Sequence, residues 1–317
     1  MITSLLLRNT ALASAPLALG LWMGLAGRRL RQSNCARILT FHGTPRERAR
    51  EYERQFRYLR RQFQVVPLRT LVDGVGGGGP GLARRLVLTF DDGCRSNVEV
   101  IYPILKRLGL TATFFVCPGL IDSRRWLWNV EARQRLNAIS DGLIDEICRE
   151  LGAPGGTEPL IRWMKSLDLQ SRNDVERRIR EASPHYSPSA AQREDADLAD
   201  WQELRNLDPA VITIGSHTLS HPILSRLSGP ELEAEVGMSR RALEDKLERP
   251  VELFAYPNGD LDEGVRECVS RHYRGAVTTR QQWVRSGIDP LLLPRLDAPR
   301  GAVRLCWNLH REASPDS

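Results

Sequence analysis

Short apolar runs, rich in β-branched and aromatic residues, alternate along this chain with segments of helical periodicity. The runs lie at residues 37–42, 85–90, 112–117, 211–216, 251–255 and 275–279. A run that is apolar throughout is typical of a strand covered on both faces, as in a parallel sheet. Amphipathic segments separate the runs, at residues 46–63, 98–108, 230–247 and 261–272. This alternation predicts one domain with an α/β barrel.

One long stretch interrupts the alternation. Residues 122–200 contain no convincing strand, but they hold helical spacings and three tryptophans, Trp126, Trp128 and Trp163. We interpret this stretch as a helical insertion in which the tryptophans pack, although such rings could also stack on sugars. The glycine-rich residues 74–81 are expected to form a flexible loop, and no Lys-Ser/Thr pair follows them as in a phosphate-binding loop.

The N-terminus carries an uncharged segment at residues 10–27, with Arg8 before it and three arginines after it. Its 18 residues are at the lower limit of what spans a bilayer. The small-residue pattern at 13–15 precedes most of the apolar run, so a cleavable signal is not supported. We therefore divide the chain into a membrane-associated segment, 1–36, and a barrel, 37–317. The segment either spans the membrane, with the arginines favouring a cytoplasmic barrel, or lies on the membrane or the domain as a helix.

The charge balance and the cysteine spacing indicate which partners and structural sites the chain is expected to have. The chain has 45 Lys and Arg against 39 Asp and Glu, and five of those arginines fall in the first 39 residues, which contain no acid. The excess thus borders the apolar segment instead of forming a patch within the domain, so a membrane surface is favoured over nucleic acid as a partner. The six cysteines show no CxxC spacing and predict no disulfide framework or zinc ribbon.

Polar residues with the chemistry of a metal site follow two of the predicted strands. Asp91 and Asp92 come directly after residues 85–90, and His217 and His221 follow residues 211–216. Two adjacent carboxylates repel one another unless a cation is near. Neutral imidazoles combined with a carboxylate are the ligands of a catalytic divalent metal. In α/β folds the ends of the strands host active sites, so these residues predict a metal centre.

A turn follows a third strand. Tyr256, Pro257, Asn258 and Gly259 come after residues 251–255, and their backbone N–H groups suit a developing oxyanion. Two further polar residues lie at the ends of apolar runs. His42 ends the first run, and Arg295 ends a later one.

Four ordered motifs carry a resemblance to a known family. LTFDDG at 88–93, SHTLSHP at 216–222, FAYPNG at 254–259 and LPR at 293–295 resemble those of the polysaccharide deacetylases, carbohydrate esterase family four, with the NodB-homology domain. The resemblance covers roughly residues 37–297. It implies a deformed (β/α) barrel of seven or eight strands that removes acetyl groups from sugars. It also implies that Asp91 is the general base, that Asp92, His217 and His221 bind the metal, and that the turn at Asn258 stabilises the oxyanion.

The chain departs from the family pattern at two places. The commonest third motif has an arginine where this chain has Ala255, so we assign the orientation of the base to Arg295, as in relatives bearing FAYP. The last family motif supplies a general acid and is not found, because His310 fits its leucine pattern poorly. His42, which resembles a histidine at this place in relatives, is the preferred substitute.

These features predict a metal-dependent deacetylase acting on N-acetyl or O-acetyl groups of a cell-surface polysaccharide or its precursor. Zinc is the expected metal, with cobalt, nickel and manganese as alternatives. An amidase of the same fold, acting on a lipid-linked sugar or a small amide, and a catalytically silent glycan-binding module are the competing interpretations. The expected partners are an acetylated glycan and, through residues 10–27, a bacterial inner membrane. The oligomeric state and the side of the membrane are left open.

Overall fold

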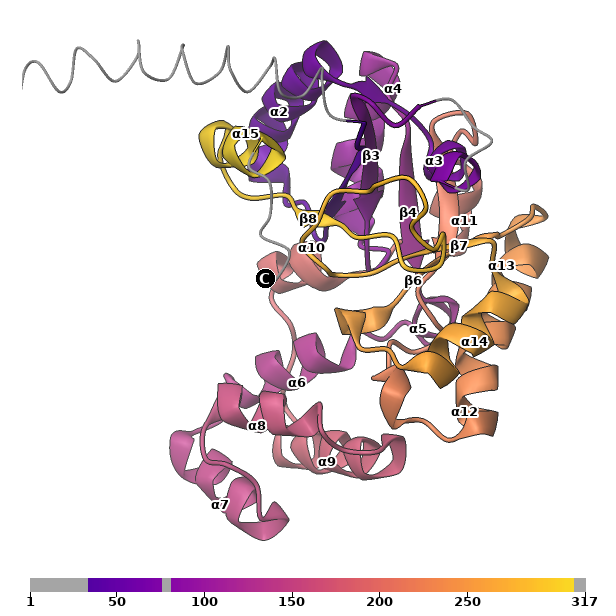
Figure 1. Ribbon diagram of the computed structural model, residues 1–317. Helices are drawn as coiled ribbons and strands as arrows, with labels where there is room; N and C mark the ends of the chain where they lie inside the picture. Colours follow the sequence, from indigo (N-terminus) through magenta and orange to yellow (C-terminus); the bar gives the residue numbers. More distant parts are fainter. Residues whose placement is uncertain (1–33, 76–80, 311–317) are drawn as a thin grey trace, which may run out of the picture.

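A curved parallel sheet forms the centre of the computed structural model, which describes residues 34–75 and 81–310 (Figure 1). The strands follow the order β7-β6-β5-β4-β3-β1-β8, and β2 pairs with β3 off this path. All named pairs are parallel. The strands are β1 (Arg37–Phe41), β2 (Gln64–Val65), β3 (Arg85–Phe90), β4 (Ala112–Val116), β5 (Ile212–Ser216), β6 (Leu253–Ala255), β7 (Gly275–Val277) and β8 (Leu296–Asp297).

The two edges of the sheet are joined by the segment that leads into β8. Leu293 forms a parallel bridge with Val277 of β7, and Leu296 pairs with Leu39 of β1. The sheet is thereby curled into a deformed barrel, as predicted. The short length of β6, β7 and β8, two or three residues each, makes this side of the barrel irregular.

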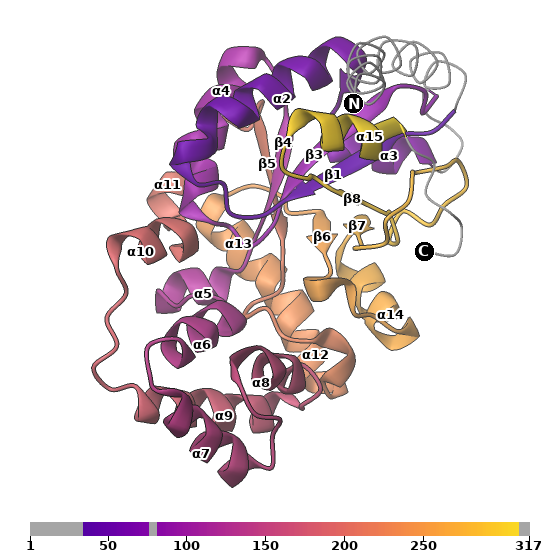
Figure 2. The ribbon, with the colours of Figure 1, turned by 90° about the vertical axis from the view of Figure 1, so that its left-hand side faces the viewer.

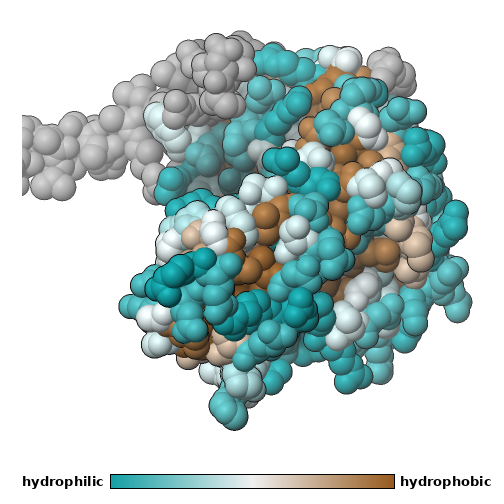
Figure 3. Space-filling view, turned by 90° about the horizontal axis from the view of Figure 1, so that it is seen from below, coloured by the Kyte–Doolittle hydropathy of each residue, from teal (hydrophilic) through white to brown (hydrophobic). Residues whose placement is uncertain are grey.

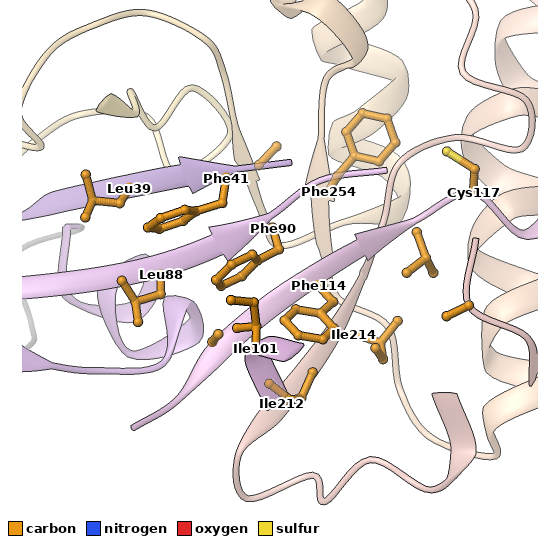
Figure 4. Packing of buried hydrophobic residues seen from close by; sticks show 14 of the residues in the cluster. Leu39, Phe41, Leu88, Phe90, Ile101, Phe114, Cys117, Ile212, Ile214 and Phe254 are labelled. Carbon is orange, nitrogen blue, oxygen red and sulfur yellow. The ribbon is translucent and has the colours of Figure 1, made fainter. Parts of the chain in front are cut away.

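Helices cover the outside of the barrel (Figure 2). They include η1 (Arg46–Arg48), α2 (Ala49–Gln62), α3 (Leu68–Val75), η2 (Asn97–Ile101), α4 (Tyr102–Leu108), α5 (Pro118–Ser123), α11 (Trp201–Arg205), η3 (Leu224–Arg226), α12 (Gly229–Glu233), η4 (Ala234–Met238), α13 (Ser239–Leu247), η5 (Pro257–Gly259), α14 (Glu263–His272) and α15 (Ala302–His310). Alternate strand residues point outward and pack beneath them, with the rings of Phe41 and Phe90 stacked at 4.8 Å and Phe114 edge-on to Phe90 at 5.2 Å (Figure 4).

The intervening strand residues point into the barrel. Ile38, Val87, Phe115, Leu253 and Val277 belong to one buried cluster separate from the outer one. Because side chains alternate along a strand, residues Thr89 and Asp91 continue the inward face of Val87. The inside of the barrel is therefore apolar along most of its length and polar only where the strands end.

The insertion is helical and has a core of its own. It contains α6 (Trp128–Leu136), α7 (Asp141–Leu151), α8 (Thr157–Met164), α9 (Leu169–Ala182) and α10 (Ala190–Ala196). Its buried cluster includes Trp128, Leu136, Leu160, Met164 and Ile179 and contains no strand residue. The prediction of a helical insertion is confirmed, and Trp128, 3% exposed, packs as expected.

Some of the expectations from the sequence agree with the structure, and others do not. The six expected strands are found within one or two residues of their predicted ends, whereas β2 and β8 are too short to be recognised as apolar runs. The first two residues of the loop expected at 74–81 are helical, because α3 continues to Val75. All six cysteines are buried, and none of them forms a disulfide in the part of the chain that the structure describes. The apolar segment 10–27 lies outside the described residues, and none of the described helices is long and apolar enough to cross a membrane.

Gly215 tests how tightly the barrel interior is packed. A Cβ at this position would lie 2.5 Å from the Phe115 ring and 3.0 Å from the Leu253 carbonyl oxygen. We expect Gly215→Ala to lower the free energy of unfolding by about 1–3 kcal/mol through overpacking, measured by urea unfolding. Gly142→Ala is the control, because it has open space around it in α7 and should be neutral or slightly stabilising. Equal effects of the two substitutions would contradict a close-packed interior.

Candidate functional site

The predicted site residues lie at the carboxyl ends of the strands. Asp91 and Asp92 follow β3, His217 follows β5, and Asn258 follows β6. Parallel strands place these ends at one edge of the sheet, where the inward-facing side chains converge. Seen from below in Figure 3, this side of the molecule has hydrophilic residues around its rim and apolar residues toward its middle.

Asp91 and Arg295 form a buried, two-pronged ion pair. Arg295 Nη1 donates to Asp91 Oδ1 and Nη2 to Asp91 Oδ2, both at 2.7 Å, and both side chains are nearly inaccessible to solvent. Arg295 Nε donates to the Thr278 carbonyl at 2.9 Å and Nη1 to Thr89 Oγ1 at 3.1 Å. Burial alone would raise the pKa of Asp91, but the guanidinium outweighs it and holds that pKa well below its usual range. Asp91 is therefore an ionised carboxylate.

Asp92 lies beside two histidines. Its Oδ1 is 3.6 Å from His217 Nε2 and 3.7 Å from His221 Nε2. These separations are too long for hydrogen bonds. They match the ~3.4 Å between neighbouring ligand atoms around a tetrahedral ion with bonds of about 2.1 Å. Burial raises the pKa of Asp92, and the imidazoles of His42 and His217 offset only part of that rise, so a cation would stabilise the carboxylate.

The environment of each imidazole suits metal ligation. His217 Nδ1 lies 2.7 Å from the Ala255 carbonyl oxygen, so this nitrogen is the donor and Nε2 is left with a free lone pair toward Asp92. Burial and the neighbouring His217 hold the pKa of His221 well below its usual value, which keeps this ring neutral. A neutral imidazole is the form that binds a metal. Asp92, His217 and His221 thus offer one carboxylate and two nitrogen ligands that fit a divalent cation.

Backbone strain is concentrated in the loops that carry these side chains. Asp92, Thr218, His221 and Asn258 have φ values of 73°, 68°, 58° and 56°, in the left-handed region that non-glycine residues rarely adopt. Gly93 continues this conformation with a φ of 73°. Such residues persist only where their surroundings hold them, and they gather at functional sites.

Glu235 of η4 holds the histidine loop in place. Its Oε2 accepts hydrogen bonds from the N–H groups of Leu219 and Ser220 at 2.8 and 2.9 Å, and its Oε1 accepts the Ser220 hydroxyl at 2.6 Å. From the insertion, Trp128 Nε1 donates to the His221 carbonyl at 3.1 Å. The sequence analysis did not identify Glu235, and it predicted packing for Trp128 but not this contact with the histidine loop. Neither residue lies in a motif, so the pattern gives no signal for either role.

Lys165, at the end of α8, reaches the turn after β6. Its Nζ donates to Asn258 Oδ1 at 3.0 Å, across 93 positions of sequence. This contact brings a cation to the turn that was predicted to stabilise an oxyanion. Nothing in the sequence pattern indicates it, because the insertion carries no motif.

The two candidate acids differ in their positions. His42 is exposed directly after β1, and its charge lowers the pKa of both Asp91 and Asp92, so it lies near the site. The end of α15 lies elsewhere, since the Leu309 carbonyl accepts from Arg37 Nε at the amino end of β1. His310, which fits the family pattern poorly, follows Leu309, and its side chain lies outside what the structure describes.

A second trio of metal-ligand type lies between the end of α12 and α14, formed by Glu233, Cys268 and His272. Here Glu233 Oε1 already lies 2.6 Å from His272 Nε2, and Glu233 Oε2 accepts from Arg271 at 3.0 Å. The arginine neutralises the carboxylate, so this trio is a hydrogen-bonded network.

The family model described as "Polysaccharide deacetylase" matches residues 78–274, which include β3, β4, β5 and β6. The chain belongs to the polysaccharide deacetylase family. The resemblance inferred from the four motifs is confirmed. No curated protein sequence matches this deacetylase.

Solved structures share the fold of this polysaccharide deacetylase. The deacetylase PplD of Streptococcus pyogenes, in complex with acetate, has a TM-score of 0.58 and 17% identity and covers 89% of this chain and 99% of its own. IcaB from Ammonifex degensii has a TM-score of 0.58 and 16% identity, covering 88% and 98%. The BpsB deacetylase domain from Bordetella bronchiseptica has a TM-score of 0.54 and 14% identity, covering 84% and 96%.

Removing the guanidinium from the Asp91–Arg295 pair should destabilise the metal-free protein in a pH-dependent way. Arg295→Gln leaves a buried carboxylate unpaired, which costs about 3–5 kcal/mol at pH 7. In the wild type, the lowered pKa of Asp91 stabilises the fold at pH values above about 3.9, the pKa of this carboxyl group in the unfolded chain. This stabilisation is lost as the pH falls below that value. The difference between the two proteins should therefore be smaller at pH 4 than at pH 7, measured by urea unfolding with a chelator present.

Arg226 provides the control for this substitution, because it is exposed and has no ion pair among the residues that the structure describes. Arg226→Gln should stay within about 0.5 kcal/mol of the wild type at either pH. A pH-independent effect of Arg295→Gln would mean that lost packing, and not the unpaired charge, causes the loss.

Proposed function

We propose that this family member is a metal-dependent deacetylase that hydrolyses N-acetyl or O-acetyl groups of a cell-surface polysaccharide or its precursor. The observation that carries the proposal is the spacing of Asp92, His217 and His221 around one point, with the ionised Asp91 adjacent in sequence. Zinc suits this nitrogen and oxygen ligand set, as do cobalt, nickel and manganese. We further propose that the barrel works at a membrane, to which residues 10–27 attach it.

A divalent cation at these ligands would polarise the acyl oxygen and lower the pKa of a bound water. Asp91 is the general base that accepts the proton of the attacking water. Arg295 orients this carboxylate through both of its oxygens and keeps it ionised, as a base must be. The backbone N–H of Asn258 donates to the oxygen on which negative charge develops. His42, at the mouth of β1, returns a proton to the departing sugar amine.

The base and the metal ligands can be tested apart. Asp91→Asn should keep bound zinc but lower acetate release from acetylated chito-oligosaccharides by about 100- to 10,000-fold, the usual contribution of a general base. His217→Ala should lose both zinc and turnover. Equilibrium dialysis measures the zinc, and an acetate assay with and without chelator measures the turnover.

His185 is the matched control, because it is exposed within the insertion, away from the strand ends. His185→Ala should retain zinc and wild-type turnover. Acetate release by Asp91→Asn at the wild-type rate rules out Asp91 as the base, and turnover that survives complete chelation rules out metal dependence.

Lys165 should contribute to the rate through Asn258. A hydrogen bond to a charged group is worth about 1.5–3 kcal/mol, so Lys165→Met should lower kcat by about 10- to 100-fold with little change in KM. Lys106→Met serves as the control, because Lys106 lies on α4 and makes its contacts with Tyr102 and Asp208. An unchanged kcat for Lys165→Met, or an equal loss in the control, would show that the Lys165 contact plays no part in the reaction.

A further inference from the structure

A hollow of about 600 Å³ lies beside the strand ends, between the start of the insertion and its return to the barrel. Its wall is formed by the segment after β3, the end of α5, the end of α10 and the start of α11. Figure 2 shows α11 beside the strands, with α10 and then α5 below it. The residues that define its chemistry are Arg95, Arg124, Arg125, Trp126, Arg193 and Trp201.

The hollow adjoins the proposed metal site through the backbone. Ala199 N–H donates to the Gly93 carbonyl at 2.9 Å, and Arg95 N–H donates to the Asp197 carbonyl at 2.8 Å. Arg95 follows Asp92 by three positions, which is at most about 11 Å of extended chain. The hollow therefore begins close to Asp92 along the chain, and the proposed catalytic residues do not line it.

The acids of the hollow are already engaged. Asp197 accepts from Trp126 Nε1 at 2.8 Å and from Arg95 Nη1 at 3.3 Å, and Asp122 accepts from Trp201 Nε1 at 2.8 Å. Asp200 caps α11 by accepting the Glu203 N–H at 2.8 Å. The hydrogen bonds to Asp197 and Asp122 also fix the indole rings of Trp126 and Trp201. The ammonium of Lys246 lies over the Trp201 ring, 5.7 Å from its centroid.

Two of the four arginines are free. Arg95 binds Asp197 and Glu203, and Arg125 binds Glu131 and Glu176. Arg124 and Arg193 are exposed, and their guanidinium groups form no hydrogen bond or ion pair within residues 34–75 and 81–310. The charged groups of the hollow that have no partner among the described residues are therefore cationic. Guanidinium groups bind carboxylates and phosphates through paired hydrogen bonds.

We propose that this hollow is a subsite for an anionic sugar that neighbours the acetamido sugar being deacetylated. Arg124 and Arg193 bind its carboxylate or phosphate, and the fixed rings of Trp126 and Trp201 form apolar walls for the sugar. The subsite rests on the proposed deacetylase function and gives that function a substrate class, an acidic heteropolysaccharide.

Binding to the zinc-loaded Asp91→Asn protein provides the test. The probes are a hyaluronan hexasaccharide, in which acetamido and carboxylated sugars alternate, a 6-phosphorylated chitohexaose, and neutral chitohexaose. We expect at least one anionic probe to bind about tenfold or more tightly than chitohexaose, and the arm that does so identifies the anion. Adding Arg124→Ala and Arg193→Ala should remove this preference and leave chitohexaose affinity within about twofold.

The control replaces two exposed arginines elsewhere, Arg226→Ala and Arg241→Ala, which removes the same charge and should keep the preference. The subsite is overturned if all probes bind with equal affinity or if none of them binds. It is also overturned if the control variant loses the preference for the anionic probe to the same extent. If Asp91→Asn does not fold, the same comparison is made with active proteins. The KM for each probe is then measured by acetate release for the wild type and for the Arg124→Ala/Arg193→Ala variant. Chelator-sensitive release from chitohexaose without any anionic preference overturns the subsite alone, whereas no release from any probe overturns the deacetylase proposal.

Discussion

The ion pair between Asp91 and Arg295 links the parts of the barrel that the site requires. Arg295 precedes β8 and Asp91 follows β3, with β1 between these strands, and the same guanidinium donates to the Thr278 carbonyl beyond β7. One side chain thus connects the regular and the irregular sides of the barrel. Its burial makes the contact costly to break, because either partner alone would be an uncompensated charge in an apolar interior. The ion pair that connects the two sides of the barrel therefore also fixes the charge state of the proposed base.

The strained loops depend on supports that lie outside them. Four non-glycine residues of the site have left-handed backbones, each costing of order 1–3 kcal/mol. Glu235 offsets this cost for the histidine loop by accepting two backbone N–H groups and a hydroxyl. Trp128 holds the His221 carbonyl from the other side. The imidazoles are consequently placed before any ion binds, which reduces the ordering that metal binding must supply.

Sequence patterns identified the parts of this structure that repeat locally. Continuous apolar runs predicted six strands, because burial on both faces makes every residue of a strand apolar. Three of the four family motifs lie where such runs end, and LPR at 293–295 follows a later apolar run. The same patterns were silent on β2 and β8, whose two residues each carry no periodicity. They were also silent on Glu235 and Lys165, because their roles arise from tertiary contacts spanning 15 and 93 positions. The ligand spacing around Asp92 is likewise a property of two loops, after β3 and after β5, and not of any one segment.

The insertion is where this chain's specificity is most open to variation. Its own apolar core allows its surface to change without disturbing the barrel. Yet it contacts the site at three points: Trp128 on the His221 carbonyl, Lys165 on Asn258, and residues 197–199 beside residues 93–95. A unit that folds on its own core but attaches at the metal loops can alter substrate recognition while the reacting groups stay fixed. In the proposed function, the barrel would thereby supply the reacting groups and the insertion would select the glycan that reaches them.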